Sequence, residues 1–527
     1  MNIKLLFFSF GLLLFWQLAA YGQTTNLKGF VKDSKSNQSI DGATIYFPTL
    51  KLGCISELDG LYKVDNIPFG KYKVVVKHIG YITLGKEIEI SKAKENNIDF
   101  SLEMEVKELL GIEIKNDLDF NQTFIKITIK KSNIEENSVR DIGELLRTIP
   151  NIQAVRKGGA NLDPVIRGFK FDQLNVQLDN GMTVEGGCPN RMDPTTSHVE
   201  AEDIESIEVL KGPFTLRYGP VMGGVVNLNT LNPRPFDKFE IHVKGNISYE
   251  SNWNGTRQHF AVLGGNKKFF FTFTGNNSVY GDYEDGENNS VPSSFRKFGV
   301  TGKLGFAIKK NQIITASYSE FYARNISFPT LPMDERKDNT KLYSLDYKAR
   351  NISKLIETIN IKSYFTDVDH TMDNYERSSS DSMASVSHIL ATRLGYRAEI
   401  GLNAFTGHLF VGTDFYKINK DGDRVKNLIM QMPTSAGVVP IKVEDLWNKA
   451  VINDFGFFSE YTKRKGSWEY VGAVRIDYNS AFCDSINLKN TAGASILRVI
   501  ADSTISSYLN FSFSLGATKM LSEKMSL

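Results

Sequence analysis

The feature that most constrains the fold is a long alternation of apolar and polar residues, which begins near residue 236 and continues to the end of the 527-residue chain. In segments 239–250, 468–478 and 509–517, apolar residues stand at alternate positions. Because successive side chains of a strand point to opposite faces, each segment predicts a strand with one apolar and one polar face. Strands this long, with aromatic residues near their ends, are typical of membrane β-barrels, whereas soluble sandwiches usually have shorter strands.

We expect about twelve such strands between residues 236 and 527, at roughly 20 to 25 residues per strand and connection. Outer-membrane barrels that hold a plug have about 22 strands. The chain also ends at Lys524-Met525-Ser526-Leu527, without the terminal aromatic residue that such barrels usually present for assembly. The alternating region therefore predicts an antiparallel transmembrane β-barrel that is incomplete in this chain, as in a C-terminally truncated protein.

The N-terminus predicts export. One lysine, Lys4, precedes the apolar run 5–20, and Ala20-Tyr21-Gly22 forms a small-x-small site. This pattern is that of a secretory signal peptide cleaved before Gln23. A membrane anchor would need roughly 20 apolar residues, and the run is shorter.

The composition excludes several classes of function. The chain has 62 basic and 60 acidic residues, so the charge balance gives no indication of a nucleic-acid partner. Its three cysteines exclude a disulfide framework. The segment from Gly80 to Lys86 nearly spells a phosphate-binding loop, but Glu87 stands where Ser or Thr must bind magnesium. We also find no nucleophile motif and no hydrolytic metal triad, so we expect neither an enzyme nor a resident cofactor.

Residues 23–104 predict a small β-sandwich. Segments such as 29–33, 42–45 and 68–72 are short, rich in β-branched and aromatic residues, and separated by turn residues. The whole stretch resembles the carboxypeptidase regulatory-like domain. This resemblance implies no peptidase, because none of the seven histidines opens the His-x-x-Glu ligand pair of a zinc hydrolase.

Residues 105–235 predict an α+β domain. The segment 140–150 predicts a short amphipathic helix that ends at Pro150. Segments 165–169 and 174–181 predict two strands, the second closed by an Asn-Gly turn. Two runs follow, Ile-Glu-Ser-Ile-Glu-Val-Leu-Lys-Gly-Pro at 204–213 and the glycine-rich run Arg-Tyr-Gly-Pro-Val-Met-Gly-Gly-Val-Val-Asn at 217–227.

This series closely resembles the plug domain of TonB-dependent outer-membrane receptors, and the two runs carry the resemblance. It implies a mainly β protein of the outer membrane whose plug lies inside the barrel and whose partners are the TonB energy-transducing complex and membrane lipid. The segment from Glu105 to Lys115 stands where the family carries its TonB-contacting segment. An extended segment of this kind can add an edge strand to a partner's sheet, although an ordinary linker strand is an equally good interpretation.

Within the plug region, Cys188 and Met192 form a Cys-x-x-x-Met pair flanked by Gly-Gly and Asp-Pro. A thiolate and a thioether are soft ligands that suit Cu(I) and bind hard cations poorly. Most such pairs are packing residues, but the flanking glycines and prolines predict a loop instead. The segment also resembles the plug loop of TonB-dependent copper receptors.

In the barrel region, His370 and Met372 stand two residues apart, so on a strand both side chains point to the same face. The copper receptors carry a His-x-Met in a similar setting. The resemblance implies one site built from Cys188, Met192, His370 and Met372, with copper as the transported ligand. These donors suit Cu(I) better than zinc or an iron chelate. We interpret Met182, Met222 and His198 as structural residues.

The predicted organisation is a signal peptide at 1–22, a carboxypeptidase regulatory-like β-sandwich at 23–104, a receptor plug at 105–235 and a partial outer-membrane β-barrel at 236–527. The alternative in the same class is a receptor for a siderophore or another small ligand, in which the Cys188 pair is incidental, or a truncated receptor without function. A surface or adhesion protein that transports nothing would need no plug.

Overall fold

The computed structural model describes residues 24–527 apart from residues 35, 58, 79–80, 93–95, 104–125, 137–138, 190, 212–215, 221, 429–440, 491–495, 523–524 and 527. The chain divides into two compact units, Met1–Glu113 and Ile114–Leu527. The predicted signal peptide and the predicted TonB-contacting segment lie outside the described residues.

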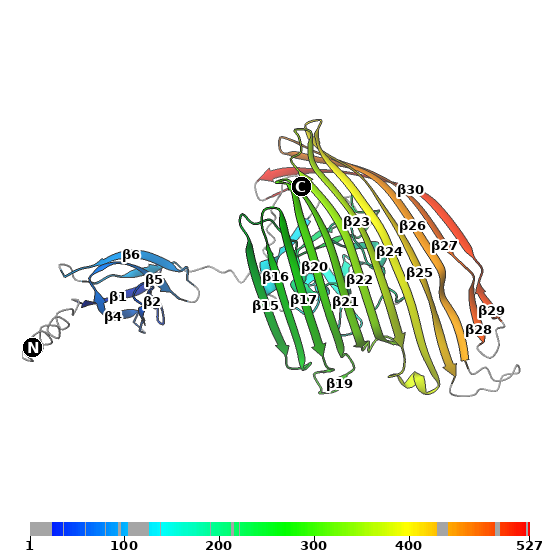
Figure 1. Ribbon diagram of the computed structural model, residues 1–527, viewed down its shortest axis with the longest axis horizontal. Coiled ribbons are helices and arrows are strands. Elements are labelled where there is room, and N and C mark those ends of the chain that lie inside the picture. The colour runs from blue at the N-terminus through cyan, green and yellow to red at the C-terminus, as the bar shows by residue number, and fades with distance from the viewer. Residues whose placement is uncertain are drawn as a thin grey trace, which may run out of the picture. The chain divides into compact units, whose positions relative to one another are not determined.

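The N-terminal unit is a β-sandwich, as predicted. One sheet has the order β4-β1-β7, and the other has the order β3-β2-β5-β6 (Figure 1). Their alternate residues, among them Leu27, Ile45 and Phe100, meet in one buried apolar core. The strands are β1 (Thr24–Asp33), β2 (Thr44–Phe47), β3 (Leu52–Ile55), β4 (Leu61–Pro68), β5 (Gly70–Lys77), β6 (Leu84–Ile90) and β7 (Phe100–Leu102).

The plug has a four-stranded sheet of order β12-β14-β13-β8 and a three-stranded sheet of order β11-β10-β9. Its strands are β8 (Lys126–Lys130), β9 (Ile152–Arg156), β10 (Leu162–Ile166), β11 (Phe169–Lys170), β12 (Leu174–Leu178), β13 (Ile204–Lys211) and β14 (Gly224–Thr230). Its helical elements are α2 (Lys131–Glu136), α3 (Ile142–Leu146), η1 (Phe171–Gln173), η2 (Thr195–His198) and η3 (Ala201–Asp203). The Ile-Glu run thus forms β13, and the glycine-rich run leads into β14, which pairs with it.

Helix α3 lies within the segment 140–150 that was predicted to be an amphipathic helix, and it is shorter than predicted. Asp141 caps its N-terminus, because the carboxylate accepts the backbone N–H of Glu144 at 3.0 Å. Leu145 and Leu146 on its apolar face are buried. No helix in the described part of the chain is long and apolar enough to cross a membrane.

The large antiparallel sheet contains fifteen strands within the described residues, twelve of which have eleven or more residues. The long strands are β15 (Glu240–Glu250), β16 (Gly255–Gly265), β17 (Phe269–Tyr280), β20 (Phe295–Lys309), β21 (Gln312–Ile326), β22 (Asp334–Arg350), β23 (Ile356–Asp373), β24 (Met383–Ala404), β25 (Gly407–Leu428), β26 (Ile441–Lys465), β27 (Trp468–Cys483) and β30 (Thr504–Ser522). Short strands β28 (Ile486–Asn490), β29 (Ile496–Ala501) and β31 (Met525–Ser526) complete the sheet, and β18 (Tyr283–Glu284) and β19 (Ser290–Val291) form a separate hairpin. A last 3-10 turn is η4 (Ser378–Asp381).

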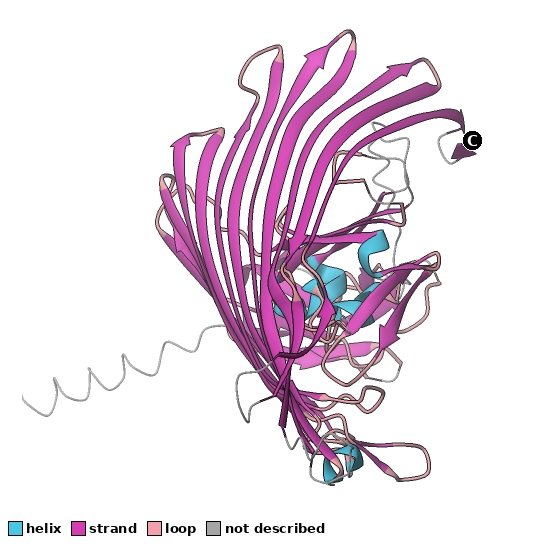
Figure 2. Cartoon of the chain, turned by 90° about the vertical axis from the view of Figure 1, so that its right-hand side faces the viewer, coloured by secondary structure: helices cyan, strands magenta, loops and turns pink. Residues whose placement is uncertain are grey.

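The sheet is curved, and the plug lies in its hollow (Figure 2). Strand β23 shows the predicted alternation: Ile361 and Phe365 are exposed on the outer face, whereas Lys362, Thr366 and His370 are buried on the inner face. An apolar outer face and a polar inner face match the barrel pattern that the sequence predicted. The polar residues of the inner face are the ones that meet the plug.

Candidate metal centre between the plug and the sheet

The Cys-x-x-x-Met segment lies in the loop between β12 and η2. The carboxylate of Asp193 fixes this loop, because it accepts the backbone N–H of Gly187 at 2.5 Å and that of Cys188 at 3.1 Å. The N–H of Arg191 donates to the carbonyl oxygen of Cys188 at 3.0 Å and closes a turn. The loop is therefore held by hydrogen bonds of its own backbone, as the flanking glycines and prolines predicted.

Strands β9 and β10 and the residues between them anchor the same loop. Asn161 donates to the carbonyl oxygen of Met192 at 2.7 Å, and Lys157 donates to that of Arg191 at 3.0 Å. The Arg191 guanidinium pairs with Asp163 at 2.8 Å. These contacts fix both ends of the Cys188–Met192 pair against the body of the plug.

On the sheet, His370 and Met372 point to the inner face of β23, as their spacing predicted, and both are buried. Asp338 on the neighbouring strand β22 stands opposite His370, and its carboxylate lies 3.2 Å from His370 Nδ1. Thr340 donates to the other oxygen of Asp338 at 2.7 Å. His370 Nε2 is buried and has no hydrogen-bond partner among the described residues. A histidine held at Nδ1 by a carboxylate, with Nε2 left over, is the arrangement usual for a metal-binding imidazole.

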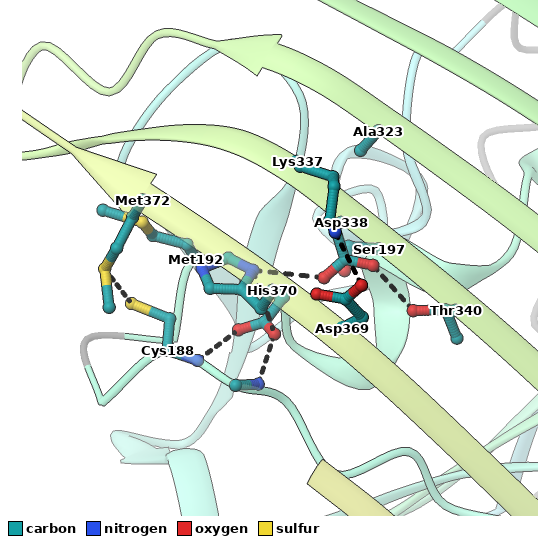
Figure 3. A network of polar contacts seen from close by, with 12 residues as sticks. Cys188, Met192, Ser197, Ala323, Lys337, Asp338, Thr340, Asp369, His370 and Met372 are labelled. Atoms are coloured by element: carbon teal, nitrogen blue, oxygen red, sulfur yellow. Dashed lines mark hydrogen bonds and ion pairs between the residues drawn. The ribbon is translucent and has the colours of Figure 1, made fainter. Parts of the chain in front are cut away.

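The loop and the strand meet at three points around His370 and Met372 (Figure 3). The carboxylate of Asp193 lies 3.6 Å from His370 Nδ1. Cys188 Sγ lies 3.8 Å from Met372 Sδ. Gly187 lies against His370 so closely that a Cβ at this position would be 2.5 Å from the His370 Cβ, so only glycine fits without a shift.

All four predicted residues are nearly inaccessible to solvent. Cys188, Met192 and Met372 belong to one apolar cluster, together with side chains such as Phe328 and Met333. A loop and a buried position are therefore compatible here, because the sheet covers the loop. Cys188 and Met192 are thus loop residues and packing residues at once, although the sequence favours a loop over a packing role.

Several polar residues at the centre were not predicted as part of it. His198, interpreted as structural, lies with Nε2 3.3 Å from the Asp193 carbonyl oxygen and Nδ1 4.0 Å from Asp338. Glu335 on β22 lies close enough to Asp338 and His370 for their oxygen and nitrogen atoms to share one ion. Asp193 stood in the Asp-Pro flank of the motif and was the only one of these with a sequence signal. Asp338 and Glu335 are brought in by strand pairing, which no local spacing reveals.

A cavity of 670 Å³ borders Cys188. Its wall includes Cys188 and Glu185 from the plug and Tyr364, Arg393 and Trp447 from the sheet. The Cys188 side of the centre therefore faces a space large enough for a small ligand.

The comparisons with known proteins agree with this architecture. The TonB-dependent Receptor Plug Domain model matches residues 121–226, and the CarboxypepD_reg-like domain model matches residues 27–112. The probable TonB-dependent siderophore receptor PirA of Acinetobacter baumannii is 32% identical over 162 residues, which cover 28% of this chain and 19% of that protein. The ferrienterobactin receptor of Escherichia coli is 34% identical over 117 residues, or 20% of this chain and 16% of that one.

Two solved structures share the fold. The copper transporter OprC superposes with a TM-score of 0.66 at 23% identity, covering 76% of this chain and 60% of that one. The ferric yersiniabactin uptake receptor FyuA from Yersinia pestis gives a TM-score of 0.59 at 15% identity, covering 76% of this chain and 63% of that one. The chain thus spans about three fifths of the length of these structures and matches less than a fifth of each curated relative above.

These relatives are receptors and transporters and not enzymes, which confirms the prediction that the chain is not an enzyme. The chain therefore carries a TonB-dependent receptor plug domain with a carboxypeptidase regulatory-like domain ahead of it, and the sheet around the plug has the fold of these solved receptors.

Proposed function

We propose that the protein is an outer-membrane, TonB-dependent transporter that takes up copper as Cu(I), through a site formed by Cys188, Met192, His370 and Met372. The observation that carries the proposal is the contact of two sulfur atoms across the interface. Cys188 Sγ of the plug and Met372 Sδ of the sheet lie 3.8 Å apart. The unpartnered Nε2 of His370 supplies a further donor on the same strand.

The chemistry of these donors supports a soft, monovalent ion. A thioether cannot compete with water for a hard cation, but it binds Cu(I) well, as do a thiolate and an imidazole. The sulfur-containing side chains are buried largely among apolar residues, which favours the same choice. Cys188 must lose its proton to bind, so copper affinity falls as the pH is lowered.

The division of the ligands between two bodies supports a transport role. Cys188 and Met192 are on the plug, whereas His370 and Met372 are on the sheet. A movement of the plug relative to the sheet separates the two pairs, and a ligand that binds only the assembled state is released when that state is lost. Work done on the plug by the TonB complex would release copper in this way.

Uptake of a siderophore is the second candidate, and the cavity favours it. At 670 Å³ it has the size of sites for organic ligands, and it is lined by Arg393 and by aromatic rings such as Tyr364 and Trp447. Of the similar curated proteins, one is named as a probable siderophore receptor and another as a ferrienterobactin receptor. In this case the sulfur contact is packing only.

The test is Cu(I) binding to the full 527-residue chain in detergent under reducing conditions, with a competing chelator and with Ag(I) as a mimic. We expect Cys188→Ser/His370→Ala to weaken binding by about 100-fold or more, because losing even the hydrogen-bond partner of a ligand costs about 10- to 100-fold. Cys54→Ser and Met182→Leu, which change a thiol and a thioether elsewhere, should bind as the parent does. Parent-like binding by the double variant would overturn the copper proposal in favour of a siderophore-type receptor.

A further inference from the structure

Two carboxylates, one from the sheet and one from the plug, lie beside the same nitrogen atom of His370. Asp338 on β22 has an oxygen 3.2 Å from His370 Nδ1 (Figure 3), and Asp193 of the plug has one at 3.6 Å. All three side chains are at most 3% exposed. Nδ1 therefore carries a proton and points it toward these oxygens, and Nε2 is the nitrogen left to face a metal ion.

A second histidine closes this arrangement into a ring. His198 of η2 has Nε2 3.3 Å from the backbone carbonyl oxygen of Asp193 and Nδ1 4.0 Å from the carboxylate of Asp338. One oxygen of Asp338 faces His198, and the other faces His370. Asp193, His370, Asp338 and His198 thus follow one another in a closed ring, called the His-Asp ring below. Two members belong to the plug and two to the sheet, so the ring crosses their interface twice.

Asp193 of the ring also holds the loop that carries the sulfur ligands of the plug. Its Oδ2 accepts the N–H of Gly187, and its Oδ1 accepts that of Cys188. A Cβ on Gly186 would lie 2.7 Å from Asp193 Oδ1, so a glycine at this position lets the carboxylate fold back onto the loop. The Asp193 oxygen beside His370 is the one that accepts from Gly187. One carboxylate therefore contacts both the backbone of the plug loop and the imidazole of the sheet.

A second carboxylate holds the same loop from outside the ring. Asp163 on β10 pairs at 2.8 Å with Arg191, which stands between the two sulfur ligands of the loop. Asp163 and Asp193 are equally buried, at 3% exposed. Among the residues that the structure describes, no hydrogen bond or ion pair joins Asp163 to His370. The two aspartates therefore separate a role in holding the loop from a role at the imidazole.

We propose that Asp193 and His198 are positioning residues of the metal site, which hold His370 in its binding orientation while the plug is docked. The groups around the second nitrogen of a ligating imidazole fix the ring and make it more basic. Here Asp338 supplies such a group from the sheet, and Asp193, held by His198, supplies one from the plug.

The ring couples the sheet ligand to the position of the plug. When the plug shifts, His370 loses Asp193 at the same time as the metal loses the two sulfur ligands of the loop. The ligand on the sheet is then weakened by the same movement that removes the ligands on the plug. This inference rests on the proposed function, because it requires His370 to be a ligand.

The test is a pair of double-mutant cycles on the full chain in detergent, with Ag(I) as the probe. Asp193→Asn is made in the parent and in His370→Ala, and Asp163→Asn is the matched control in the same two backgrounds. In the parent, Asp193→Asn should weaken Ag(I) binding about 10- to 100-fold, the usual cost of losing a partner of a metal ligand. In His370→Ala this effect should be smaller by a factor of ~3 or more, because the imidazole that Asp193 positions is absent. The control should have the same effect in both backgrounds.

Two additions keep the test decisive. The same cycles are run without metal, with the midpoint of thermal unfolding as the readout, which measures the link between the plug and the sheet by itself. His198→Leu leaves the contacts of Asp193 with the loop in place. It should show the same coupling with His370 in Ag(I) affinity, so the result does not depend on the folding of Asp193→Asn.

The outcomes for this inference differ from those for the proposed function. Coupling of Asp193 and His198 with His370 in Ag(I) affinity supports the positioning role. Additive effects on Ag(I) affinity overturn it, even if the unfolding midpoints are coupled, since the ring would then only link the plug to the sheet. Parent-like Ag(I) binding by His370→Ala alone contradicts the ligand role of His370 and thus the proposed site. Weakened binding in His370→Ala together with additive cycles contradicts the positioning role and leaves the proposed site intact.

Discussion

The plug meets the sheet in two regions of opposite chemistry. In the sulfur corner, defined by Cys188, Met192, His370 and Met372, the three sulfur-containing side chains pack among apolar residues. In the ionic interface, defined by Arg217 of the plug and Glu399, Arg397, Asp414 and Arg475 of the sheet, charged side chains form a continuous chain of pairs. The plug contacts the same sheet in both regions. The two regions differ in which hydrogen-bonding groups are left without a partner.

The ionic interface has its hydrogen-bonding capacity filled. Arg217 donates to both oxygens of Glu399, at 3.1 and 2.7 Å, and Arg475 donates to both oxygens of Asp414, at 3.0 and 2.6 Å. Two hydrogen bonds with matched geometry offset much of the cost of burying such charges. In the sulfur corner, by contrast, His370 Nε2 has no partner in the described residues. The capacity to bind a ligand is therefore found where a buried donor lacks a partner, as at His370, and not where charge is densest.

The largest effect is expected from breaking the ionic interface. Arg217→Ala leaves Glu399 and Glu460 buried without this partner, and removing one member of a buried pair costs about 3–5 kcal/mol. Thermal unfolding of the detergent-solubilised chain should show a clear fall of the midpoint. Arg234→Ala, at an exposed position of the plug, serves as the control. An unchanged midpoint would mean that these pairs do not hold the plug.

Acid should weaken a second ion pair between the plug and the sheet, that of Asp179 with Lys303. Burial alone would raise the pKa of Asp179, but Lys303 and Lys362 hold the pKa of this carboxyl well below its usual range. A depressed carboxyl pKa contributes stability that is full above the unfolded value near 4 and is lost as the pH falls below it. Asp179→Asn should therefore be less stable than the parent at pH 7, by on the order of 2 kcal/mol, and approach it near pH 2.

The measurement for Asp179 is the unfolding midpoint as a function of pH. Asp237→Asn, whose carboxylate is 99% exposed, should follow the parent at every pH. Parallel curves for Asp179→Asn and the parent would show that this pair contributes nothing to the acid sensitivity.

A smaller effect is expected at Asp338, the carboxylate that contacts His370 of the sulfur corner. Asp338 holds Nδ1 of His370 and so leaves Nε2 available as a ligand atom. Asp338→Asn should lower Ag(I) affinity by about 10- to 100-fold, because the carboxylate both orients a ligating imidazole and raises its basicity. Asp346→Asn, on the same strand but paired with Lys362, should keep the parent affinity. Equal affinities for the two variants would remove Asp338 from the site.

The smallest effect on stability separates packing from ligation in the sulfur corner. Met192→Leu keeps the volume of the side chain, so the free energy of unfolding should change by less than about 1.5 kcal/mol. Ag(I) binding should nevertheless weaken, since a thioether ligand is lost. In Met182→Leu, elsewhere in the plug, both quantities should stay near the parent. Full Ag(I) affinity in Met192→Leu would limit this methionine to packing.

Much of the fold was predictable because its signals are local. A period of two is visible within a single strand, so the segments around Phe239, Trp468 and Leu509 predicted β15, β27 and β30 without knowledge of their partners. The capped helix α3 and the strands of the plug follow from short patterns of the same kind. The domain boundaries remain predictions, as do the signal peptide and the TonB-contacting segment.

For the candidate site, the sequence by itself determined which soft donors exist and that each pair shares one loop or one strand face. Only the tertiary structure decided that the pairs meet: Cys188 and Met372 are 184 positions apart, and their contact depends on the fit of Gly187 against His370. Strand pairing, in turn, placed Asp338 opposite His370. Such contacts arise from register and from the shapes of two surfaces. Neither leaves a period or a spacing in the chain, so they could be found only after folding.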